Sequence, residues 1–261
     1  MRFRRRHATT EGGGGDPYWI SFSDLMSALL VIFILAVVIL VLQLTEKQRA
    51  LAAEQETVRE QRELFAAQVG TLREAELVRA EMLREIQENL RAQGIEVIVS
   101  ENNSVLSIPT ALLGFESASY EIEEEFHDVS LAIGTAIADA LAKDDRYKHL
   151  DTVFVEGHTD NVHFEGLEGT GNWGLSTFRA ISLWRLWEEQ LPQDKRLDSF
   201  VSTTGDPLFS TSGYAETRPA TETQDTDAER AANRRIDIRF TVIRPSADDL
   251  SEIIELSGEG T

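Results

Sequence analysis

The 261-residue chain contains no cysteine, which excludes disulfides, thiolate metal ligands and a cysteine nucleophile. Basic residues are also scarce, because 25 Lys and Arg stand against 45 Asp and Glu, for a formal net charge of -20. A surface of that sign repels nucleic-acid phosphates, so we expect no nucleic acid among the partners. The motifs offer no nucleophile with a base and an orienting partner. We therefore predict a protein that is not an enzyme and that needs no cofactor and no metal.

One long hydrophobic stretch, residues 25–42, contains a single polar side chain. Eighteen such residues are enough to cross a bilayer as a helix. Asp16 can cap this helix and Pro17 suits its first position. We predict a transmembrane helix over 17–44 and, before it, a basic arm over 1–16. A cleaved signal peptide is the alternative, but the apolar run is long for one and no small-residue cleavage site follows it.

The segment 45–93 carries ten acidic and eight basic residues and no proline, and it is rich in helix-forming Glu, Arg, Gln and Ala. A single apolar residue recurs every seven positions, at Leu44, Leu51, Val58, Phe65 and Leu72. Since the companion positions of the heptad are polar, the apolar surface is too narrow for a stable two-stranded coiled coil. We predict a charged helical linker that acts as a spacer, either as a single helix or as a loose two-stranded coil.

Residues 94–261 hold 13 basic and 32 acidic side chains, so most of the negative charge lies there. Their apolar patterns predict helices alternating with strands around one small sheet, which is an α+β domain over 94–245 with an acidic C-terminal tail over 246–261. The expected strands are 95–99, 105–109, 152–156 and 236–243. The expected helices are 122–142, 177–190 with Ser176 as its cap, and 228–232.

Two charged residues of opposite sign are placed to share one groove in this domain. Asp160 follows a predicted strand end, and Arg179 falls in the first turn of the predicted helix 177–190. A carboxylate and a guanidinium side by side suit a zwitterionic ligand, whose ammonium binds the first and whose carboxylate binds the second. A structural ion pair between the two is the alternative.

Four motifs follow one another in the domain: VEGHTDNV from Val155, NWGLSTFRA from Asn172, GYAETRPA from Gly213 and ANRRIDIRF from Ala232. In this order they resemble the OmpA/MotB-type peptidoglycan-binding domain. The resemblance implies that the ligand is the diaminopimelate of the cell-wall stem peptide. It places on groove positions Thr159, Asp160, Asn172, Leu175 and Arg179, with Arg234 and Arg235 supporting the groove from the last strand.

Two features of the domain stand apart from that resemblance. The Gly-rich stretch 165–171 is an insertion between two groove motifs, and it puts contacts at the rim in doubt. His158, Asp160 and His163 suggest zinc, but no fourth ligand is in view and neighbouring strand positions alternate faces. We therefore interpret His158 as a packed histidine.

Asp24 is the one ionisable residue inside the predicted span. A charged residue at mid-span costs about 2.5 to 3.5 kcal/mol on insertion scales and is by default a functional-site hypothesis. Small residues that let another helix approach lie three or four positions away on one face, at Ser21, Ser27 and Ala28. Capping or snorkelling at the membrane interface is the alternative role of this carboxylate.

The stretch PYWISFSDLMSALLVIFILAVVIL, from Pro17, resembles the transmembrane helix of MotB-type stator B subunits. The resemblance implies that Asp24 carries protons and that a pentamer of a MotA-like A subunit surrounds a B-subunit homodimer in a rotary motor. A peptidoglycan ligand then places the distal domain in the periplasm and 1–16 in the cytoplasm, around one pass through the inner membrane. The opening WISFSDLM and the aliphatic run after it are most similar to the B subunit of the Zorya anti-phage system. A flagellar stator subunit and a purely structural membrane-to-wall tether are the alternatives.

Overall fold

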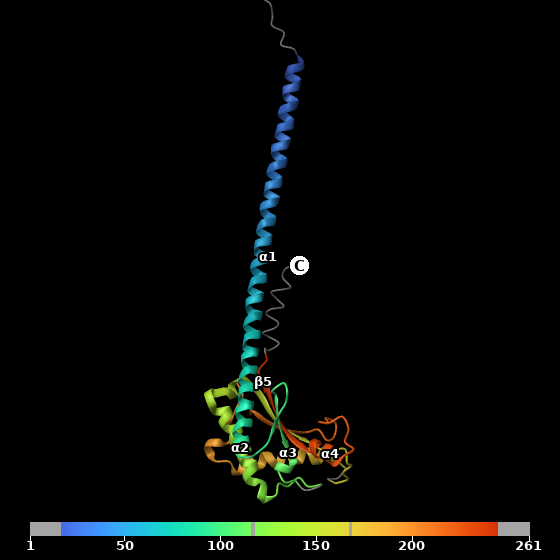
Figure 1. The fold of residues 1–261 in the computed structure, drawn as a ribbon. Helices are drawn as coiled ribbons and strands as arrows, with labels where there is room; N and C mark the ends of the chain where they lie inside the picture. Colours follow the sequence, from blue (N-terminus) through green and yellow to red (C-terminus); the bar gives the residue numbers. More distant parts are fainter. Residues whose placement is uncertain (1–16, 116–117, 167–168, 245–261) are drawn as a thin grey trace, which may run out of the picture. The chain divides into compact units, whose positions relative to one another are not determined.

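The computed structural model describes residues 17–115, 118–166 and 169–244, with side chains from Phe22 onward. The predicted basic arm and acidic tail lie outside the described residues. The chain divides into two compact units that meet in the sequence at Glu63 and Leu64. The long helix α1, Pro17–Ala92, contributes residues to both units (Figure 1).

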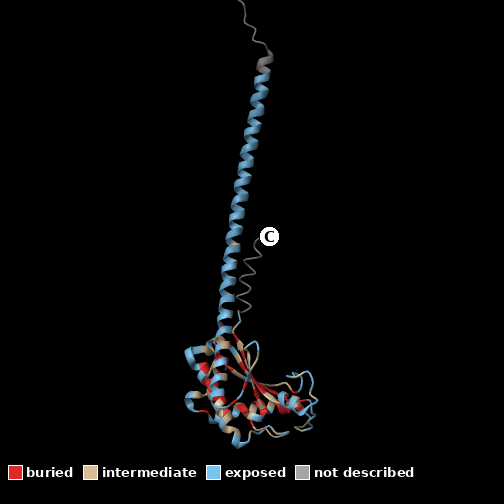
Figure 2. Cartoon of the chain, viewed as in Figure 1, coloured by how far each residue is buried: buried red, intermediate tan, exposed pale blue. Residues whose placement is uncertain are grey.

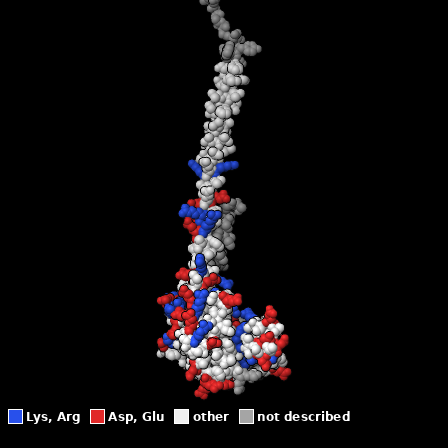
Figure 3. Space-filling view, viewed as in Figure 1, with Lys and Arg blue, Asp and Glu red and all other residues white. Residues whose placement is uncertain are grey.

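In the first unit, nearly all the described side chains of α1, from Phe22 to Glu63, are exposed (Figure 2). The helix is long and apolar enough to cross a membrane, and none of its most apolar window is buried in the structure. The hydroxyl groups of Ser27 and Thr45 donate to the carbonyl oxygens of Ser23 and Val41, each at 2.8 Å. Helical bonds of this kind satisfy polar groups that lipid cannot solvate. Figure 3 shows a mostly uncharged surface over the apolar part of this helix and charged side chains below it.

The second unit is built on a five-stranded sheet in the order β1-β2-β5-β3-β4. Strand β4 runs parallel to β3, and the other neighbours are antiparallel. The strands are β1 (Ile98–Val99), β2 (Val105–Pro109), β3 (Leu150–His158), β4 (Phe209–Gly213) and β5 (Arg235–Val242). The α-helices that follow α1 are α2 (His127–Ala142), α3 (Gly171–Gln190) and α4 (Asp227–Asn233).

The two faces of this sheet differ in chemistry because side chains alternate along each strand. One face is apolar and joins a single core with α1, α2 and α3; its buried strand residues include Leu106, Ile108, Val153, Val155, Ile236, Ile238 and Phe240. The other face is polar. There Glu156 accepts two hydrogen bonds from Nε of Arg239 and a third from Nη2, and Ser107 donates to Asp237 at 2.5 Å.

The last part of α1 belongs to this core, which corrects the boundary expected between linker and domain at residue 93. Four side chains near the C-terminal end of α1 are fully buried, those of Met82, Leu83, Ile86 and Leu90. Gln87 also donates from Nε2 to the carbonyl oxygen of Val97 at 3.0 Å. The stretch that packs as part of the domain therefore includes residues assigned to the spacer.

The predicted sequence of elements is confirmed, with differences at several boundaries. Strand β1 covers only two residues of 95–99, and α2 starts at His127 after a short 3-10 turn. Helix α3 starts at Gly171, so Ser176 is an internal helix residue and not a cap. Strand β4 was missed, because FSTSG is a half-buried edge strand without apolar alternation.

Candidate functional site

A cavity of about 390 Å³ opens beside the end of β3 and the start of α3. Its lining comes from three places in the sequence: the segment before α2, the segment from the end of β3 into α3, and the segment from α4 to β5. The lining residues are Phe115, Ala118, Thr159, Asp160, Val162, His163, Phe164, Asn172, Leu175, Arg179, Arg230 and Arg234. We call this cavity the groove.

Two glycines from the sequence motifs let α3 lie directly against the sheet. A Cβ atom on Gly157 would stand 1.9 Å from the carbonyl oxygen of Ser176, and one on Gly213 would stand 2.3 Å from Oγ1 of Thr177. The buried hydroxyl of Ser176 also accepts the backbone N–H of Ala215 at 3.1 Å. Three of the four motifs are thus locked together here, and the groove lies at their junction.

Asp160 lies in the wall of the groove with a nearly buried carboxylate, 12% exposed. Its Oδ1 accepts the backbone N–H of Val162 at 3.1 Å, which fixes the side chain to its own loop. Its Oδ2 accepts Nη1 of Arg234 at 2.6 Å. The ion-pair partner of Asp160 in the structure is therefore Arg234.

Arg179 lines the same groove from the third turn of α3, later in the helix than expected, because α3 begins at Gly171. The residue is 2% exposed, and its Nε donates to the carbonyl oxygen of Ser119 at 2.8 Å. Burial and the nearby charge of Arg234 lower the pKa of Arg179 to about 10, while Asp160 opposes the shift. Arg179 remains protonated at neutral pH, and a buried cation at a cavity wall favours an anionic ligand.

Thr159 brings an unused polar atom to the groove. Its backbone N–H donates to the carbonyl oxygen of Ala215 at 2.9 Å, but its buried Oγ1 has no hydrogen-bond partner among the residues that the structure describes. Buried hydroxyls are normally paired, so an orphan at a cavity wall indicates a place for a ligand atom or a water. Leu175 lines the groove as an almost fully buried apolar residue.

Asn172 acts mainly as a brace. Its Nδ2 donates to the carbonyl oxygen of Val162 at 3.0 Å and to Oε2 of Glu216 at 3.1 Å. These two bonds tie the first turn of α3 to the loop that carries Asp160 and to the segment after β4. Asn172 lines the groove at the same time, with its amide nitrogen engaged within the protein.

Of the two neighbouring arginines, Arg234, just before β5, lines the groove, whereas Arg235, the first residue of β5, is not among the described residues that line it. Nε of Arg235 donates to both carboxylate oxygens of Asp237, and Nη2 donates to the carbonyl oxygen of Arg218. Burial opposes ionisation of Asp237, but its contacts with His158, Arg235 and Ser107 hold its pKa below the ordinary value. Alternation of side chains along a strand is the signal that separates neighbours in this way.

His158 is packed in the protein, as the sequence suggested. Its Nε2 lies 3.2 Å from Oδ2 of Asp237, and its ring stacks on Tyr214 with 5.6 Å between centroids. His163 lies in the wall of the groove. No group of three His, Asp or Glu side chains that could hold a metal ion occurs in the described part of the chain.

Asp24 lies on α1 in the first unit, within the stretch that is apolar enough to span a membrane. Its side chain and those of Ser27 and Ala28 are exposed in the single chain, whereas the side chain of Ser21 lies outside the described residues. The structure therefore leaves the face around Asp24 open to another helix, and it describes no contact there that would tie up the carboxylate.

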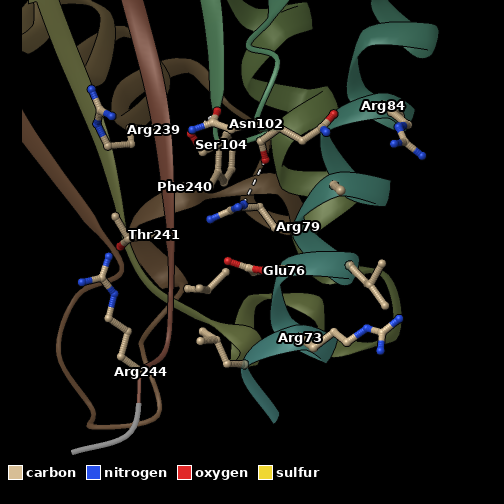
Figure 4. A pocket seen from close by; sticks show the side chains of 15 residues that line it. Arg73, Glu76, Arg79, Arg84, Asn102, Ser104, Arg239, Phe240, Thr241 and Arg244 are labelled. Atoms are coloured by element: carbon tan, nitrogen blue, oxygen red, sulfur yellow. Dashed lines mark hydrogen bonds between the residues drawn. The ribbon is translucent and has the colours of Figure 1, made fainter. Parts of the chain in front are cut away.

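A second cavity, of about 890 Å³, lies between the last part of α1, the turn before β2 and the end of β5 (Figure 4). It is lined by five arginines and one acidic residue: Arg73, Arg79, Arg84, Arg239, Arg244 and Glu76. Arg79 points inward and donates from Nε to the carbonyl oxygen of Asn103 at 2.9 Å (Figure 4). Its pKa is lowered by burial, against the charge of Glu76. Sequence reasoning missed this cluster because its α1 arginines were assigned to a solvated linker.

Comparison with known proteins gives a partial match. No protein-family model matches the chain. The chain is 26% identical over 165 residues to Motility protein B of Bacillus subtilis, in a match that covers 63% of this chain and 55% of that protein. The chain thus spans little more than half the length of the curated relative it matches.

Several solved structures are similar to the chain. One is the cell wall anchor of the T6SS from Pseudomonas aeruginosa, at 28% identity over 63% of this chain and 99% of that chain, with a TM-score of 0.45. Another is the periplasmic domain of Helicobacter pylori MotB, at 24% identity over 59% of this chain and 84% of that chain, with a TM-score of 0.42. A putative MotB-like protein from Desulfovibrio vulgaris is 17% identical over 66% of this chain and 99% of that chain, with a TM-score of 0.48.

Proposed function

We propose that this protein is the B subunit of an ion-driven motor that crosses the inner membrane once and is anchored to peptidoglycan. The observation that carries the proposal is the presence, in one chain, of a carboxylate in a helix apolar enough to span a membrane and of a groove lined by both a carboxylate and a buried cation. The similarity to Motility protein B supports it. The resemblance of the motifs names the ligand as the diaminopimelate of peptidoglycan.

The groove suits that ligand in its chemistry. Arg179 offers a positive charge that is already desolvated, so a ligand carboxylate gains a strong charge-assisted hydrogen bond there. The Asp160 carboxylate offers an acceptor for an ammonium, and the orphan hydroxyl of Thr159 offers one further polar contact. In this proposal the groove binds peptidoglycan, so the distal domain lies in the periplasm. Helix α1 then crosses the inner membrane, and its N-terminal end faces the cytoplasm.

In the membrane, Asp24 carries protons in this proposal. An apolar environment favours a neutral carboxyl group and contact with water favours the carboxylate, so a group that alternates between the two can load and release a proton. The partners are a pentamer of a MotA-like A subunit and a second copy of this chain. The open face around Asp24, Ser27 and Ala28 is where such helices would pack.

Two kinds of motor fit these parts. We favour an anti-phage motor of the Zorya type, because WISFSDLM and the aliphatic run after it resemble that B subunit, and because α1 continues as one helix from the apolar stretch to Ala92. A flagellar stator is the second candidate, and the similarity to Motility protein B of Bacillus subtilis favours it. Deleting the gene separates them, since loss of phage resistance with normal swimming indicates the first and loss of swimming the second.

Proton conduction is tested by Asp24→Asn, which keeps the shape and hydrogen-bonding capacity of the side chain but cannot ionise. We expect normal insertion and assembly with the A subunit, and no proton uptake by vesicles under an imposed potential. Asp24→Glu should retain a small part of the flux. Leu30→Val, on a different helix face, is the control and should conduct like the parent. Parent-level flux through the Asn variant would leave the membrane-to-wall tether as the function.

Wall anchoring is tested by pelleting the protein with purified cell-wall sacculi. Asp160→Ala and Arg179→Ala should each weaken binding at least tenfold, since a hydrogen bond to a charged group contributes about 1.5 to 3 kcal/mol. Arg185→Ala removes an exposed arginine from α3 outside the groove lining, and it should bind like the parent. Equal pelleting of all four proteins would remove peptidoglycan from the proposal.

A further inference from the structure

The cavity between the last part of α1, the turn before β2 and the end of β5 has no part in the proposed function, and we call it the arginine cavity. Five arginines line it together with one carboxylate, that of Glu76. One of the five is already paired, because Nη2 of Arg239 donates to Oε2 of Glu156 at 2.6 Å. The other four form no ion pair with any residue that the structure describes: Arg73, Arg79, Arg84 and Arg244. Four arginines therefore face a single carboxylate in the lining.

Arg79 is the most enclosed of these four cations. It is half-buried and points into the cavity, where its Nε donates to the carbonyl oxygen of Asn103 (Figure 4). Burial lowers its pKa, and the charge of Glu76 offsets only part of that shift. A partly desolvated guanidinium of this kind gains from a further carboxylate placed beside it.

The other three cations are exposed and spread over both walls of the cavity (Figure 4). Arg73 and Arg84 lie on α1, about 16 Å apart along the helix axis, and Arg244 follows β5. Glu81 and Glu88, one turn from Arg84 on α1, are exposed and outside the lining, and neither pairs with it. Cations spread over such a length suit an extended segment with several negative charges better than one small anion.

The chain carries a segment of that kind directly after the cavity. The acidic tail, 246–261, lies outside the described residues, and it contains five acidic residues and no Lys or Arg. The five are Asp248, Asp249, Glu252, Glu255 and Glu259. Asp248 is four positions after Arg244, which is at most about 14 Å of extended chain, and 248–259 can span up to about 40 Å. The tail is therefore long enough to reach all four cations.

We infer that the arginine cavity is the docking site of the chain's own acidic tail. Carboxylates of the tail neutralise the exposed arginines of both walls and supply the charge that Arg79 lacks. A short connection to the site gives the tail an effective concentration on the order of millimolar, so even a weak contact is occupied. Docking connects the end of β5 to the part of α1 that precedes its buried stripe.

The experiment measures binding of a fluorescent peptide with the sequence of 246–261 to the full chain in detergent, by anisotropy at low ionic strength. The parent is compared with a neutral-tail variant, in which the five acidic residues of the tail are replaced by their amides. The neutral-tail variant should bind the peptide at least tenfold more tightly than the parent, because its own tail no longer competes for the cavity. A peptide with the same five replacements should bind this variant at least tenfold more weakly than the acidic peptide.

Two double substitutions in the neutral-tail variant locate the contact. Arg73→Gln with Arg84→Gln should weaken peptide binding at least tenfold. Arg91→Gln with Arg185→Gln removes the same charge from exposed positions outside the lining and should leave binding unchanged. Equal binding by the parent and the neutral-tail variant would overturn the inference, since the site would then not be occupied by the tail. Equal losses in the two double variants would overturn it as well, because the peptide would then follow net charge and not the cavity.

Discussion

Two stretches of the same helix, 45–63 and 64–92, each carry five acidic and four basic residues but have different surroundings. In the first, nearly every side chain of α1 is exposed. In the second, Met82, Leu83, Ile86 and Leu90 are fully buried in the core of the distal domain. Glu, Arg, Gln and Ala supply helix propensity in both, so propensity does not decide where the helix packs. Met82, Leu83, Ile86 and Leu90 lie at positions i, i+1, i+4 and i+8 and form a broad apolar stripe on one helix face. Such a stripe can pack into a core, whereas one apolar residue per heptad offers too little apolar surface.

The largest effect is expected from two N-terminal truncations, one that removes residues 1–63 and one that removes residues 1–93. A fragment of residues 64–261 keeps the whole second unit, whereas 94–261 lacks the four fully buried side chains of α1, Met82, Leu83, Ile86 and Leu90. Burial of each contributes about 1.5 to 3 kcal/mol, so the four together contribute as much as the net free energy of about 5 to 15 kcal/mol that typically stabilises a whole domain. We expect a cooperative thermal transition from 64–261 and none from 94–261.

Circular dichroism in the near ultraviolet is the measurement, since it reports fixed packing of the tryptophans in α3. A fragment starting at residue 94 that melts like the longer one would show that the end of α1 is a spacer after all. It would also restore the boundary that the sequence alone indicates.

Single substitutions test the same comparison with smaller expected changes in the free energy of unfolding. Ile86→Ala empties a fully buried site and should lower the free energy of unfolding by about 2 to 5 kcal/mol. Leu51→Ala removes a side chain that is 58% exposed and should change it by less than about 0.5 kcal/mol. Urea unfolding of the full chain in detergent measures both. Equal effects of the two variants would mean that another chain covers the Leu51 position.

Periodicity predicted the distal fold well and the end of the helix poorly. Strands β2 and β5 are visible in sequence because apolar residues alternate there, on a sheet with one buried face. The heptad pattern from Leu44 to Leu72 predicts an exposed spacer, but it ends before the apolar stripe from Met82 to Leu90 that packs in the core. A helix that runs from one unit into another has no break in composition to mark the change.

The sequence motifs predicted which residues lie in the groove better than they predicted how those residues pair. Asp160 and Arg179 line one groove, as expected from their places after β3 and on α3. The partner of Asp160 was not foreseen, because Arg234 lies 74 residues away and only the pairing of β5 with β3 brings them together. Arg235, expected in the groove, is not among the described residues that line it, whereas its neighbour Arg234 is.

The smallest expected effect concerns an ion pair that holds α1 to the domain. Glu85 accepts Nζ of Lys143 and Nη1 of Arg146, each at 2.6 Å, and these bonds lower its pKa below the ordinary value. A lowered folded-state pKa means that the contribution is fully present above the unfolded value, about 4.5, and is lost as the pH falls through the folded value. Since the Glu85 side chain is 43% exposed, solvent screening limits the contribution to less than about 1 kcal/mol.

Glu85→Gln should therefore destabilise the 64–261 fragment slightly at pH 7, and the difference from the parent should shrink as the pH is lowered from 7 to 3, because the parent carboxyl group becomes protonated as the pH falls through its lowered pKa. Glu63 gives the matched control in the full chain, because its partner Arg59 lies one turn away on an exposed stretch of the same helix and both side chains are more than 60% exposed. Glu63→Gln should leave the urea midpoint unchanged at both pH values. An exposed pair within one helix contributes only about 0.3 to 0.5 kcal/mol and does not hold the helix to another element. A pH-independent loss in Glu85→Gln would indicate that Glu85 acts through packing of its side chain and not through its charge, and the ion pair would then not be what holds this part of α1 to the domain.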